Sequence, residues 1–471
     1  MKTYRRDFLK LAGLAGAGLL GSWINATAGP VSPDKSGKTA KKHSQRFNMS
    51  GYRAPAIETV RIGFIGVGNR GSAAVERMSY LQGVQIKALC DIRPEIAEKA
   101  KARIKSPGHE ATLYTENDES WMQLCRRDDI DLIYICTPWD LHTPMAVYAM
   151  EQGKHVATEI PAAQTVEECW TLVETSEKTK KHCVMLENCC YDFFELLTLN
   201  MVRQGLFGDI IHCEGAYIHD IGLFVKNKRY DYWRVKENAS RNGNLYPTHG
   251  FGPVCQILDI NRGNRLDYMI SMSSADFMLK DIAREFAAKD DYFKQFAGKP
   301  FRGNMNTSTI RTESGATIMV QHDVTSYRPY SRIHLVSGTK ATALKYPLPG
   351  KIAIGHSDWL PENEYATLEQ QYTPAIVKKI GDLAMKVGGH GGMDFMMDWR
   401  LIDCLRNGLP MDMDVYDAAA WSVIGPLSEW SVANRSAAAD IPDFTCGSWK
   451  TNIRHDISLA EGGNTEVHAI D

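Results

Sequence analysis

Several features that mark particular classes of protein are missing from this sequence of 471 residues. Its 54 basic and 56 acidic side chains nearly cancel, so no basic excess points to nucleic acid and no acidic excess to a solvating tail. It has no CxxC pair and no Cys/His cluster at metal-ligand spacing, so we expect no metal site. The eleven cysteines are scattered and odd in number, which argues against a complete disulfide framework.

Long hydrophobic runs are also missing, which bears on the N-terminal segment. The run at residues 11–24 is too short and too rich in glycine for a membrane span, so we expect no stable membrane anchor. It follows a twin-arginine pattern, RRDFLK at 5–10, and precedes an A-x-A cleavage pattern at 26–28. These patterns predict a signal peptide over residues 1–28, use of the twin-arginine export machinery, which carries folded proteins, and a periplasmic location. A basic start to a surface helix is the alternative.

The stretch around which the chain is organised begins with an apolar, β-branched run at residues 60–65. This run predicts a buried strand, and residues 72–80 carry apolar side chains at helical spacing. The motif GVGNRG joins them: Gly66 permits a tight turn, Gly68 lets a pyrophosphate approach the backbone, and Gly71 lets helix and strand pack closely. Asn69 and Arg70 lie in the same turn. The following helix N-terminus offers free N–H groups to phosphates, so we predict a dinucleotide site.

A carboxylate follows at the end of the next predicted strand. Residues 84–90 form that strand, and Asp91 lies 25 positions after Gly66, near the expected ~20. Asp91 can accept hydrogen bonds from the adenosine ribose and would repel a 2′-phosphate, which favours NAD over NADP; Arg93 weakens that preference a little. The alternative is a glycine-rich turn in some other α/β protein.

Strands and helices alternate as far as residue 187. Predicted strands at 129–136, 154–159 and 182–187 alternate with helices at 143–152 and 165–180. This rhythm predicts an α/β fold with a doubly wound parallel sheet of Rossmann type, with ligands at the carboxyl ends of the strands. The residues expected near the cofactor there are Trp139, Asp140, Leu141, His142, Glu159, Ile160 and Asn188. For His142, capping of the following helix is an alternative.

After Asn188 the pattern changes to that of an α+β domain with an open, mostly antiparallel sheet. Predicted strands lie at 210–217, 266–273, 307–311, 317–322 and 332–337, and predicted helices at 194–204, 248–261 and 394–407. We therefore divide the chain into a signal peptide (1–28), a linker (29–58), an NAD-binding domain (59–187), a substrate domain (188–445) and a C-terminal tail (446–471).

The motifs GVGNRG, CD, CTPWDLH and EIPAA occur in the order found in one known superfamily. The chain resembles the glucose-fructose oxidoreductase and inositol dehydrogenase proteins over about residues 58–410. That resemblance implies a Rossmann domain joined to an open-sheet domain that carries the sugar site. Ordinary members read E-K-P where this chain has Glu159-Ile160-Pro161, and their lysine assists proton transfer from the oxidised hydroxyl. Isoleucine cannot do so, which counts against a simple sugar dehydrogenase.

The remaining motifs are similar to those of glycoside hydrolase family 109, the NAD-dependent α-N-acetylgalactosaminidases. The matching stretches are EIPAA (159–163), ENCCY (187–191), GAY (215–217), DYWR (231–234), NLYPTHG (244–250), RPYSR (328–332) and GHGGMD (389–394). The resemblance implies that hydride leaves C3 of the sugar, the C2 proton becomes acidic, the glycosidic oxygen is eliminated, water adds at C1 and the hydride returns. No carboxylate pair is needed, as in other NAD-dependent glycosidases.

The resemblance also implies roles for particular side chains. The base must reach the sugar and titrate near neutrality. His249 is the first candidate, because it opens a predicted helix whose N-terminus would keep the imidazole neutral. Tyr330 is the second, as an acid/base or a holder of a sugar hydroxyl. The expected sugar contacts are Tyr217, Arg234, Tyr246, Pro247, Thr248, His249 and Tyr330, and Tyr246 is also expected to contact the cofactor.

Each of these residues also has a plainer interpretation. His249 could be a satisfied buried histidine and Arg234 part of a surface salt bridge, and the sequence does not decide which of His249 and Tyr330 removes the C2 proton. The alternative functions are a periplasmic NAD-dependent sugar oxidoreductase of the glucose-fructose oxidoreductase type and a non-catalytic sugar sensor. His390 stays unassigned, and a homo-oligomer is left open.

Overall fold

The computed structural model describes residues 43–226, 233–356 and 358–470. The predicted signal peptide and the first part of the predicted linker lie outside these residues. Within the described part, no helix combines the length and the apolarity that crossing a membrane would need. All eleven cysteines are free.

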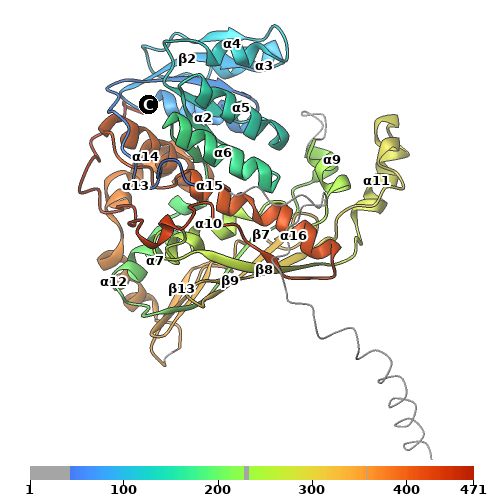
Figure 1. Cartoon of the computed structure of the whole chain (residues 1–471), viewed down its shortest axis with the longest axis vertical. Helices are drawn as coiled ribbons and strands as arrows, with labels where there is room; N and C mark the ends of the chain where they lie inside the picture. Colours follow the sequence, from blue (N-terminus) through green and yellow to red (C-terminus); the bar gives the residue numbers. More distant parts are fainter. Residues whose placement is uncertain (1–42, 227–232, 357, 471) are drawn as a thin grey trace, which may run out of the picture. The chain divides into compact units, whose positions relative to one another are not determined.

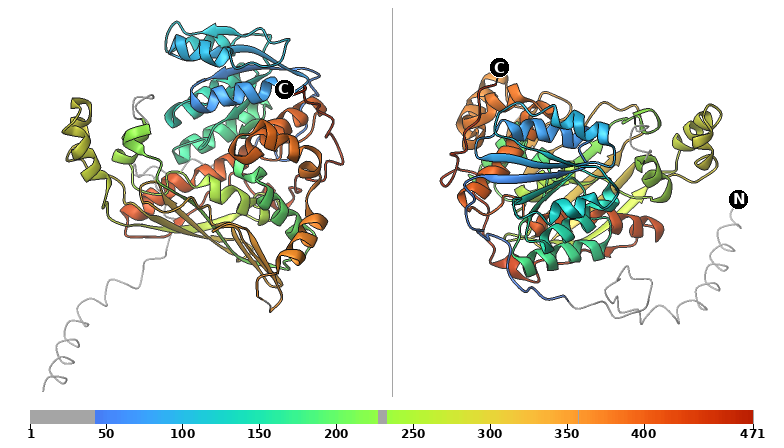
Figure 2. Two further views of the ribbon diagram at one scale, coloured as in Figure 1. Left: turned by 180° about the vertical axis from the view of Figure 1, so that it is seen from behind. Right: turned by 90° about the horizontal axis from the view of Figure 1, so that it is seen from above.

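The first layer is a parallel sheet of six strands in the described residues, in the order β3-β2-β1-β4-β5-β6. Its strands are β1 (Val60–Ile65), β2 (Val84–Cys90), β3 (Thr112–Tyr114), β4 (Leu132–Ile135), β5 (His155–Thr158) and β6 (Cys183–Met185). Every neighbouring pair is parallel. The predicted Rossmann sheet is confirmed, and its central strands β1 and β4 are buried and apolar except at Arg61, because helices cover both faces of the sheet (Figure 2).

The helices of this layer follow the strands in turn. They are α2 (Asn69–Ser79), α3 (Pro94–Lys101), α4 (Ser120–Cys125), α5 (His142–Glu151) and α6 (Val166–Thr179). α6 begins where the sequence supplies a capping box, in which the Thr165 side chain accepts from the Glu168 N–H and the Glu168 carboxylate accepts from the Thr165 N–H.

The second sheet has eight strands in the described residues, in the order β13-β12-β11-β7-β10-β9-β8-β14. They are β7 (Ile210–Ile218), β8 (Leu266–Ser273), β9 (Asn306–Thr312), β10 (Thr317–Asp323), β11 (Leu335–Gly338), β12 (Ala341–Leu344), β13 (Lys351–Ile354) and β14 (Ala439–Asp440). Only the pair β7 and β10 is parallel, so the predicted mostly antiparallel sheet is confirmed.

Helices cover one face of this sheet and connect it to the first (Figure 1). They include α7 (Phe193–Arg203), α10 (Thr248–Ile257), α14 (Met393–Asn407), α15 (Val415–Ser422) and α16 (Ile424–Ala433). The remaining α-helices of this part of the chain are α8 (Leu223–Lys226), α9 (Trp233–Ser240), α11 (Leu279–Ala287), α12 (Glu362–Tyr372) and α13 (Ala375–Val387). α10 lies on β7 and α16 on β8, whereas α14 packs on α2 and α15 on α6.

Two glycines set the distance between α10 and β7. A Cβ on Gly215 would lie 2.3 Å from the Gly250 carbonyl oxygen, and a Cβ on Gly250 would lie 2.1 Å from the Ala216 nitrogen. Neither position therefore tolerates a side chain without moving the backbone. The close approach brings the first turn of α10, with His249, against Tyr217 of β7.

Several predicted boundaries are wrong. The strand predicted at 332–337 begins only at Leu335, because Ile333 and His334 adopt positive φ angles of 59° and 49°. The helix predicted at 248–261 ends at Ile257, and Asp259 and Asn261 are left-handed. The predicted helix at 394–407 is confirmed as α14.

The described residues of the predicted linker and of the predicted C-terminal tail pack on the rest of the protein. In the part of the linker that the structure describes, Met49 is buried and its N–H donates to the Tyr416 hydroxyl. In the predicted tail, Val467 pairs with Leu81, and the Thr465 carbonyl accepts from the Trp399 indole N–H. The described residues of the linker and of the tail therefore belong to the folded body, since Met49 is buried and Val467 and Thr465 make backbone contacts there.

Candidate active site

The predicted phosphate turn has the backbone geometry that a dinucleotide needs. Gly66 has φ +80°, and a Cβ there would lie 2.8 Å from the Cys136 carbonyl oxygen. A Cβ on Gly71 would lie 2.1 Å from the Gly66 carbonyl oxygen. α2 starts at Asn69 with Gly68 as its N-cap, so the first N–H groups of an 11-residue helix follow the turn directly. The residues present therefore fit a bound NAD.

The carboxylate predicted to read the ribose lies where expected, at the end of β2. Asp91 is buried, and its oxygens accept from the Arg93 backbone N–H (3.1 Å), Nε (2.9 Å) and Nη2 (3.1 Å). The guanidinium thus orients the carboxylate and neutralises part of the charge that would repel a 2′-phosphate.

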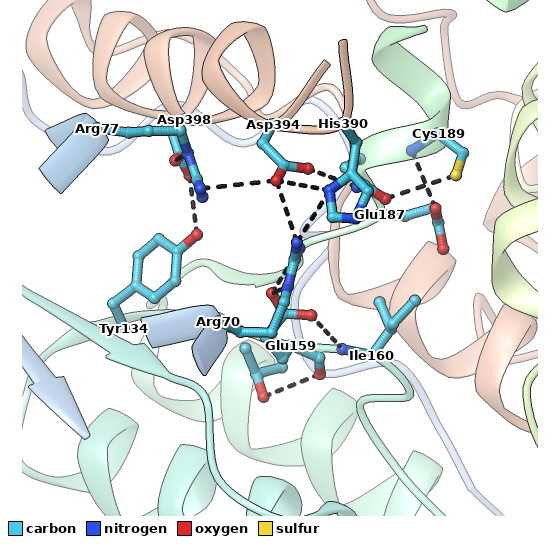
Figure 3. A network of polar contacts seen from close by, with 12 residues as sticks. Arg70, Arg77, Tyr134, Glu159, Ile160, Glu187, Cys189, His390, Asp394 and Asp398 are labelled. Carbon is cyan, nitrogen blue, oxygen red and sulfur yellow. Dashed lines mark hydrogen bonds and ion pairs between the residues drawn. The ribbon is translucent and has the colours of Figure 1, made fainter. Parts of the chain in front are cut away.

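Arg70 connects the phosphate turn to other strand ends rather than extending into solvent. Its Nε donates to Glu159 Oε1 at 2.9 Å, and its Nη1 donates to Asp394 Oδ2 at 3.1 Å (Figure 3). Asn188, at the start of the short helix after β6, donates from Nδ2 to Asp394 Oδ1 at 2.5 Å. Three predicted cofactor residues therefore share one network, which includes an aspartate that the sequence did not single out.

Aromatic rings gather beside the turn after β4. Trp139 stacks on Tyr246 with centroids 5.6 Å apart and meets the Trp233 ring edge-on at 4.9 Å. The Arg234 guanidinium lies 5.1 Å from the Trp139 centroid and 5.5 Å from that of Tyr246. Arg234 therefore takes part in a cation–π cluster. Asp231 and Tyr232 of the DYWR stretch lie outside the described residues.

The same cluster continues to the other predicted sugar contacts. Tyr217 lies 4.9 Å from Tyr246, 5.1 Å from His249 and 6.3 Å from Tyr330, measured between ring centroids. These residues come from β7, the segment before α10, α10 itself and the loop after β10. The fold therefore brings together residues that were predicted to share a sugar site.

His249 is held by a buried glutamate. Its Nδ1 lies 2.8 Å from Glu187 Oε1, and the Cys189 N–H donates to the same oxygen at 3.0 Å. Burial acts to raise the pKa of Glu187, but the His249 imidazole and these hydrogen bonds outweigh it, so the pKa lies below its usual value. An ionised carboxylate only accepts, so Nδ1 carries a proton and Nε2 is the basic nitrogen.

Tyr330 is held by a buried arginine. Arg332 Nη1 donates to the Tyr330 hydroxyl at 3.0 Å, and Arg332 Nη2 is bound by Asp192 at 2.5 Å and Glu195 at 2.6 Å. Lys345 Nζ completes this ion cluster, 2.8 Å from Glu195 Oε2. Burial raises the pKa of Tyr330 although Arg332 opposes it, so the phenol stays protonated and can donate.

The remaining predicted residues have structural surroundings of their own. His142 is buried and faces carbonyl oxygens with both ring nitrogens, Pro161 at 2.7 Å and Thr137 at 2.8 Å. Its ring does not cap α5, where Leu141 is the N-cap, and instead braces the loop after β4 against the loop after β5. Ile160 is buried beside Glu159. Asp140 and Leu141 are exposed, and Pro247 and Thr248 form the buried start of α10.

Sequence reasoning missed the residues that hold the predicted ones. Glu187 and Arg332 lie within the motifs ENCCY and RPYSR. The only signals that pointed to them are the position of Glu187 at a strand end and that of Arg332 two residues after Tyr330. Asp394 closed the GHGGMD motif, and Trp233 belonged to DYWR.

Cys189 Sγ, a Glu187 oxygen and a His249 nitrogen lie within 4.8 Å of one another and are the one potential metal-ligand group among the described residues. The His249 nitrogen and the carboxylate already bind each other.

Family models match nearly all of the folded chain. Residues 60–187 match the model described as "Oxidoreductase family, NAD-binding Rossmann fold", and residues 191–451 match "Glycosyl hydrolase 109, C-terminal domain". The boundary between the two matches falls where the sequence changes pattern.

Relatives and solved structures agree with these matches. An "Alpha-N-acetylgalactosaminidase" of Bacteroides fragilis is 48% identical over 417 residues, which cover 87% of this chain and 97% of the relative. A protein of the same name from Shewanella oneidensis is 46% identical over 458 residues, covering 95% of this chain and 97% of the relative. The structure titled "Levoglucosan dehydrogenase, complex with NADH and levoglucosan" matches this chain with a TM-score of 0.61 at 18% sequence identity. The match covers 82% of this chain and 100% of the other and shows a likeness in fold.

Proposed function

The chain belongs to glycosyl hydrolase family 109, and we propose that it removes terminal α-linked N-acetylgalactosamine from glycans. It is a glycoside hydrolase that depends on NAD. When bound, NAD accepts a hydride from C3 of the sugar and later returns it, so that the overall reaction is a hydrolysis without net redox change.

Residues at the strand ends hold the cofactor in this proposal. The backbone of the turn from Gly66 to Gly71 and the N-terminus of α2 bind the phosphates, and Asp91 binds the ribose. Trp139, Glu159 and Asn188 lie at the ends of later strands, on the side expected for the nicotinamide. The fixed positions of Glu159 and Asn188, both in contact with one network, support this assignment.

His249 acts as the base in this proposal. Once C3 of the sugar is a carbonyl, His249 Nε2 takes the proton from C2, the C1–O bond breaks and a C1–C2 double bond forms. Water then adds its oxygen to C1, the imidazolium returns its proton to C2, and the proton that the water loses balances the one taken up by the departing oxygen. The observation that carries the assignment is the 2.8 Å contact of His249 Nδ1 with ionised Glu187, which leaves Nε2 basic and stabilises the imidazolium.

Tyr330 supplies the complementary proton donor. Its raised pKa and its contact with Arg332 support a protonated phenol, which can donate to a sugar oxygen but is a poor base. We therefore assign proton abstraction to His249 and hydrogen-bond donation to Tyr330. Tyr217, Tyr246 and Arg234 form the wall against which the pyranose and its acetamido group pack in this assignment.

A decisive experiment uses p-nitrophenyl α-N-acetylgalactosaminide and purified protein without added NAD. We expect steady release of nitrophenol with no accumulation of NADH. Accumulation of an oxidised sugar without nitrophenol would instead establish the sugar oxidoreductase. His249→Ala should abolish release, and the same rate in this variant as in the parent protein would remove His249 from the mechanism.

We also propose that the enzyme is exported to the periplasm. The support is the twin-arginine pattern at residues 5–10 and the cleavage pattern at residues 26–28, which lie outside the described residues. Replacing Arg5 and Arg6 together by Lys should leave the protein in the cytoplasmic fraction with its signal segment attached. Periplasmic, processed protein from this variant would refute the proposed route.

A further inference from the structure

The motif GHGGMD, which the sequence left unassigned, forms a tight loop before α14. Gly388, Gly389, Gly391 and Gly392 have φ angles of +85°, +87°, +73° and +98°, and a Cβ on Gly389 would lie 2.7 Å from the Asp394 Cβ. Non-glycine residues rarely adopt such φ values. His390 is held at φ 48° between these glycines. The loop is therefore built to place two side chains, His390 and Asp394.

Asp394 binds Arg70 of the phosphate turn, and His390 binds Asp394. Asp394 Oδ2 accepts from Arg70 Nη1 at 3.1 Å and from His390 Nδ1 at 2.9 Å, and His390 Nδ1 lies 3.3 Å from Arg70 Nη1 (Figure 3). The His390 side chain is 58% exposed, whereas the Asp394 side chain is 2% exposed. His390 is thus the solvent-side member of this group, and Asp394 is its buried anchor.

Asp394 also binds the segment that follows β6. Its Oδ1 accepts from Asn188 Nδ2, and Arg70, which it holds, reaches Glu159 through Nε at 2.9 Å. One carboxylate from the C-terminal part of the chain therefore ties together the ends of β1, β5 and β6. The phosphate turn cannot shift relative to the other strand ends without breaking one of these contacts.

The charges around Asp394 make this tie strong. Burial acts to raise the pKa of Asp394, but the hydrogen bond from His390 and the positive charges of Arg70 and Arg77 outweigh it and hold the pKa far below its usual value. Arg77 is fixed in turn by Asp398, whose Oδ2 accepts from Arg77 Nε at 2.7 Å. The anchor therefore stays ionised at neutral pH.

We propose that Asp394 and His390 form a latch that locks the phosphate turn against the other strand ends and so slows dissociation of NAD between turnovers. The latch is a positioning device, since neither side chain is placed among the reacting groups. Its usefulness rests on the proposed function: a hydrolase that returns its hydride in each turnover has no need to exchange the dinucleotide, whereas a dehydrogenase must release NADH every time.

The test measures NAD dissociation directly and needs no glycoside. Protein loaded with NAD is diluted into an indicator dehydrogenase that reduces only free NAD. His390→Ala removes one solvent-side hydrogen bond, and we expect dissociation to be about fivefold faster. Asp394→Asn weakens the contacts to Arg70, Asn188 and His390 together, and we expect dissociation to be about a hundredfold faster. His390→Gln can still donate and should restore part of the difference.

Controls separate the latch from general damage. His212→Ala removes a half-exposed histidine that binds Thr317 on β10, and Asp412→Asn weakens a buried pair with Arg400; both should leave NAD dissociation unchanged. In the latch variants, saturating NAD should restore kcat while KM for NAD stays raised. Unchanged dissociation in folded His390→Ala and His390→Gln would overturn the proposal even if Asp394→Asn does not fold. Because the dissociation assay contains no sugar, its result is independent of whether the protein cleaves N-acetylgalactosaminides.

Discussion

Replacing Glu187 by Gln tests the central chemical assignment while changing the structure little. Both hydrogen bonds of the carboxylate, from His249 Nδ1 and from the Cys189 N–H, go to Oε1, and Oε2 has no hydrogen-bond partner in the described part of the chain. The amide oxygen of Gln should therefore take the Oε1 position, because both facing groups are donors. The histidine keeps its orientation and tautomer, the negative charge is lost, and the amide NH2 takes the place of Oε2.

The expected effect follows from that missing charge. During proton abstraction His249 becomes an imidazolium 2.8 Å from the carboxylate. A hydrogen bond between charged partners contributes about 1.5–3 kcal/mol, which corresponds to roughly a 10- to 150-fold loss in kcat. The loss should appear in kcat more than in KM, because the neutral imidazole of the ground state gains less from the carboxylate than the imidazolium does.

The assay combines steady-state kinetics with an isotope effect. Hydrolysis of p-nitrophenyl α-N-acetylgalactosaminide is compared for substrates with hydrogen and with deuterium at C2. If Glu187 stabilises the imidazolium, the C2 isotope effect should grow in Glu187→Gln, because proton abstraction becomes more rate-limiting.

A matched control is available in another buried glutamate. Glu177 accepts from the Arg46 N–H and the Tyr416 hydroxyl, and Glu177→Gln should lower stability without changing the isotope effect. A kcat for Glu187→Gln within about twofold of the parent protein, with an unchanged isotope effect, would refute the reasoning, because that change lies below the smallest expected one.

Three further predictions concern the cofactor, the proton donor and stability. Tyr330→Phe should lower kcat about tenfold or more while NAD affinity, measured by titration, is unchanged, because one hydrogen-bond donor to the sugar is lost. Asp91→Ser releases the Arg93 guanidinium and removes the charge that opposes a 2′-phosphate, so titration should show NADP binding strengthened and NAD binding weakened, each by about tenfold. Burial lowers the pKa of His182 from 6.5 to about 4, so the unfolded chain takes up this proton first as pH falls and stability is lost between those two values. From pH 8 to 5 this site alone should cost about 2 kcal/mol in urea unfolding, and His182→Asn should reduce the drop.

The parallel sheet and the cofactor turn could be predicted because their signals are local. An apolar run, three glycines at fixed spacing and an acid at the next strand end lie within residues 60–91, and the structure places them as expected. The open sheet was predicted from the strand-like runs that form β7 to β10. The hairpin of β12 and β13 was missed, because each strand has only four residues, which is too few to establish a period of two.

The packing of the chain ends could not be predicted, because their composition is that of a linker. Residues 29–58 are polar as a group, yet Met49 enters the core and Gln45 binds Tyr416, 371 positions away. One buried side chain in a polar segment produces no hydrophobic periodicity, so the sequence pattern gives no sign of it. The same holds for Val467, which pairs with Leu81.

The candidate site divides in the same way into local and distant parts. His249, Tyr330 and Arg70 could be named from motifs, and the structure places the first two in one aromatic cluster and the third at the turn. Their partners could not be named. Glu187 lies 62 positions from His249, and Asp394 lies 324 positions from Arg70. Many acids occur in the chain, and only the fold decides which of them faces which base.

In each case a buried acid holds the side chain that binds or positions a site residue, and this affects both the activity and the stability of single variants. Glu187 holds His249, Asp394 holds Arg70, and Glu195 holds Arg332, which in turn holds Tyr330. In the two acid–arginine pairs the acid is buried, so removing one partner leaves the other charge unpaired at a cost of about 3–5 kcal/mol, whereas replacing both by apolar groups is often neutral. Single variants of these two pairs therefore mix loss of positioning with loss of stability. A double-mutant cycle on Glu195 and Arg332 separates the two: stability should recover in the double variant, but activity should not, because Tyr330 would still lack the contact that fixes its hydroxyl.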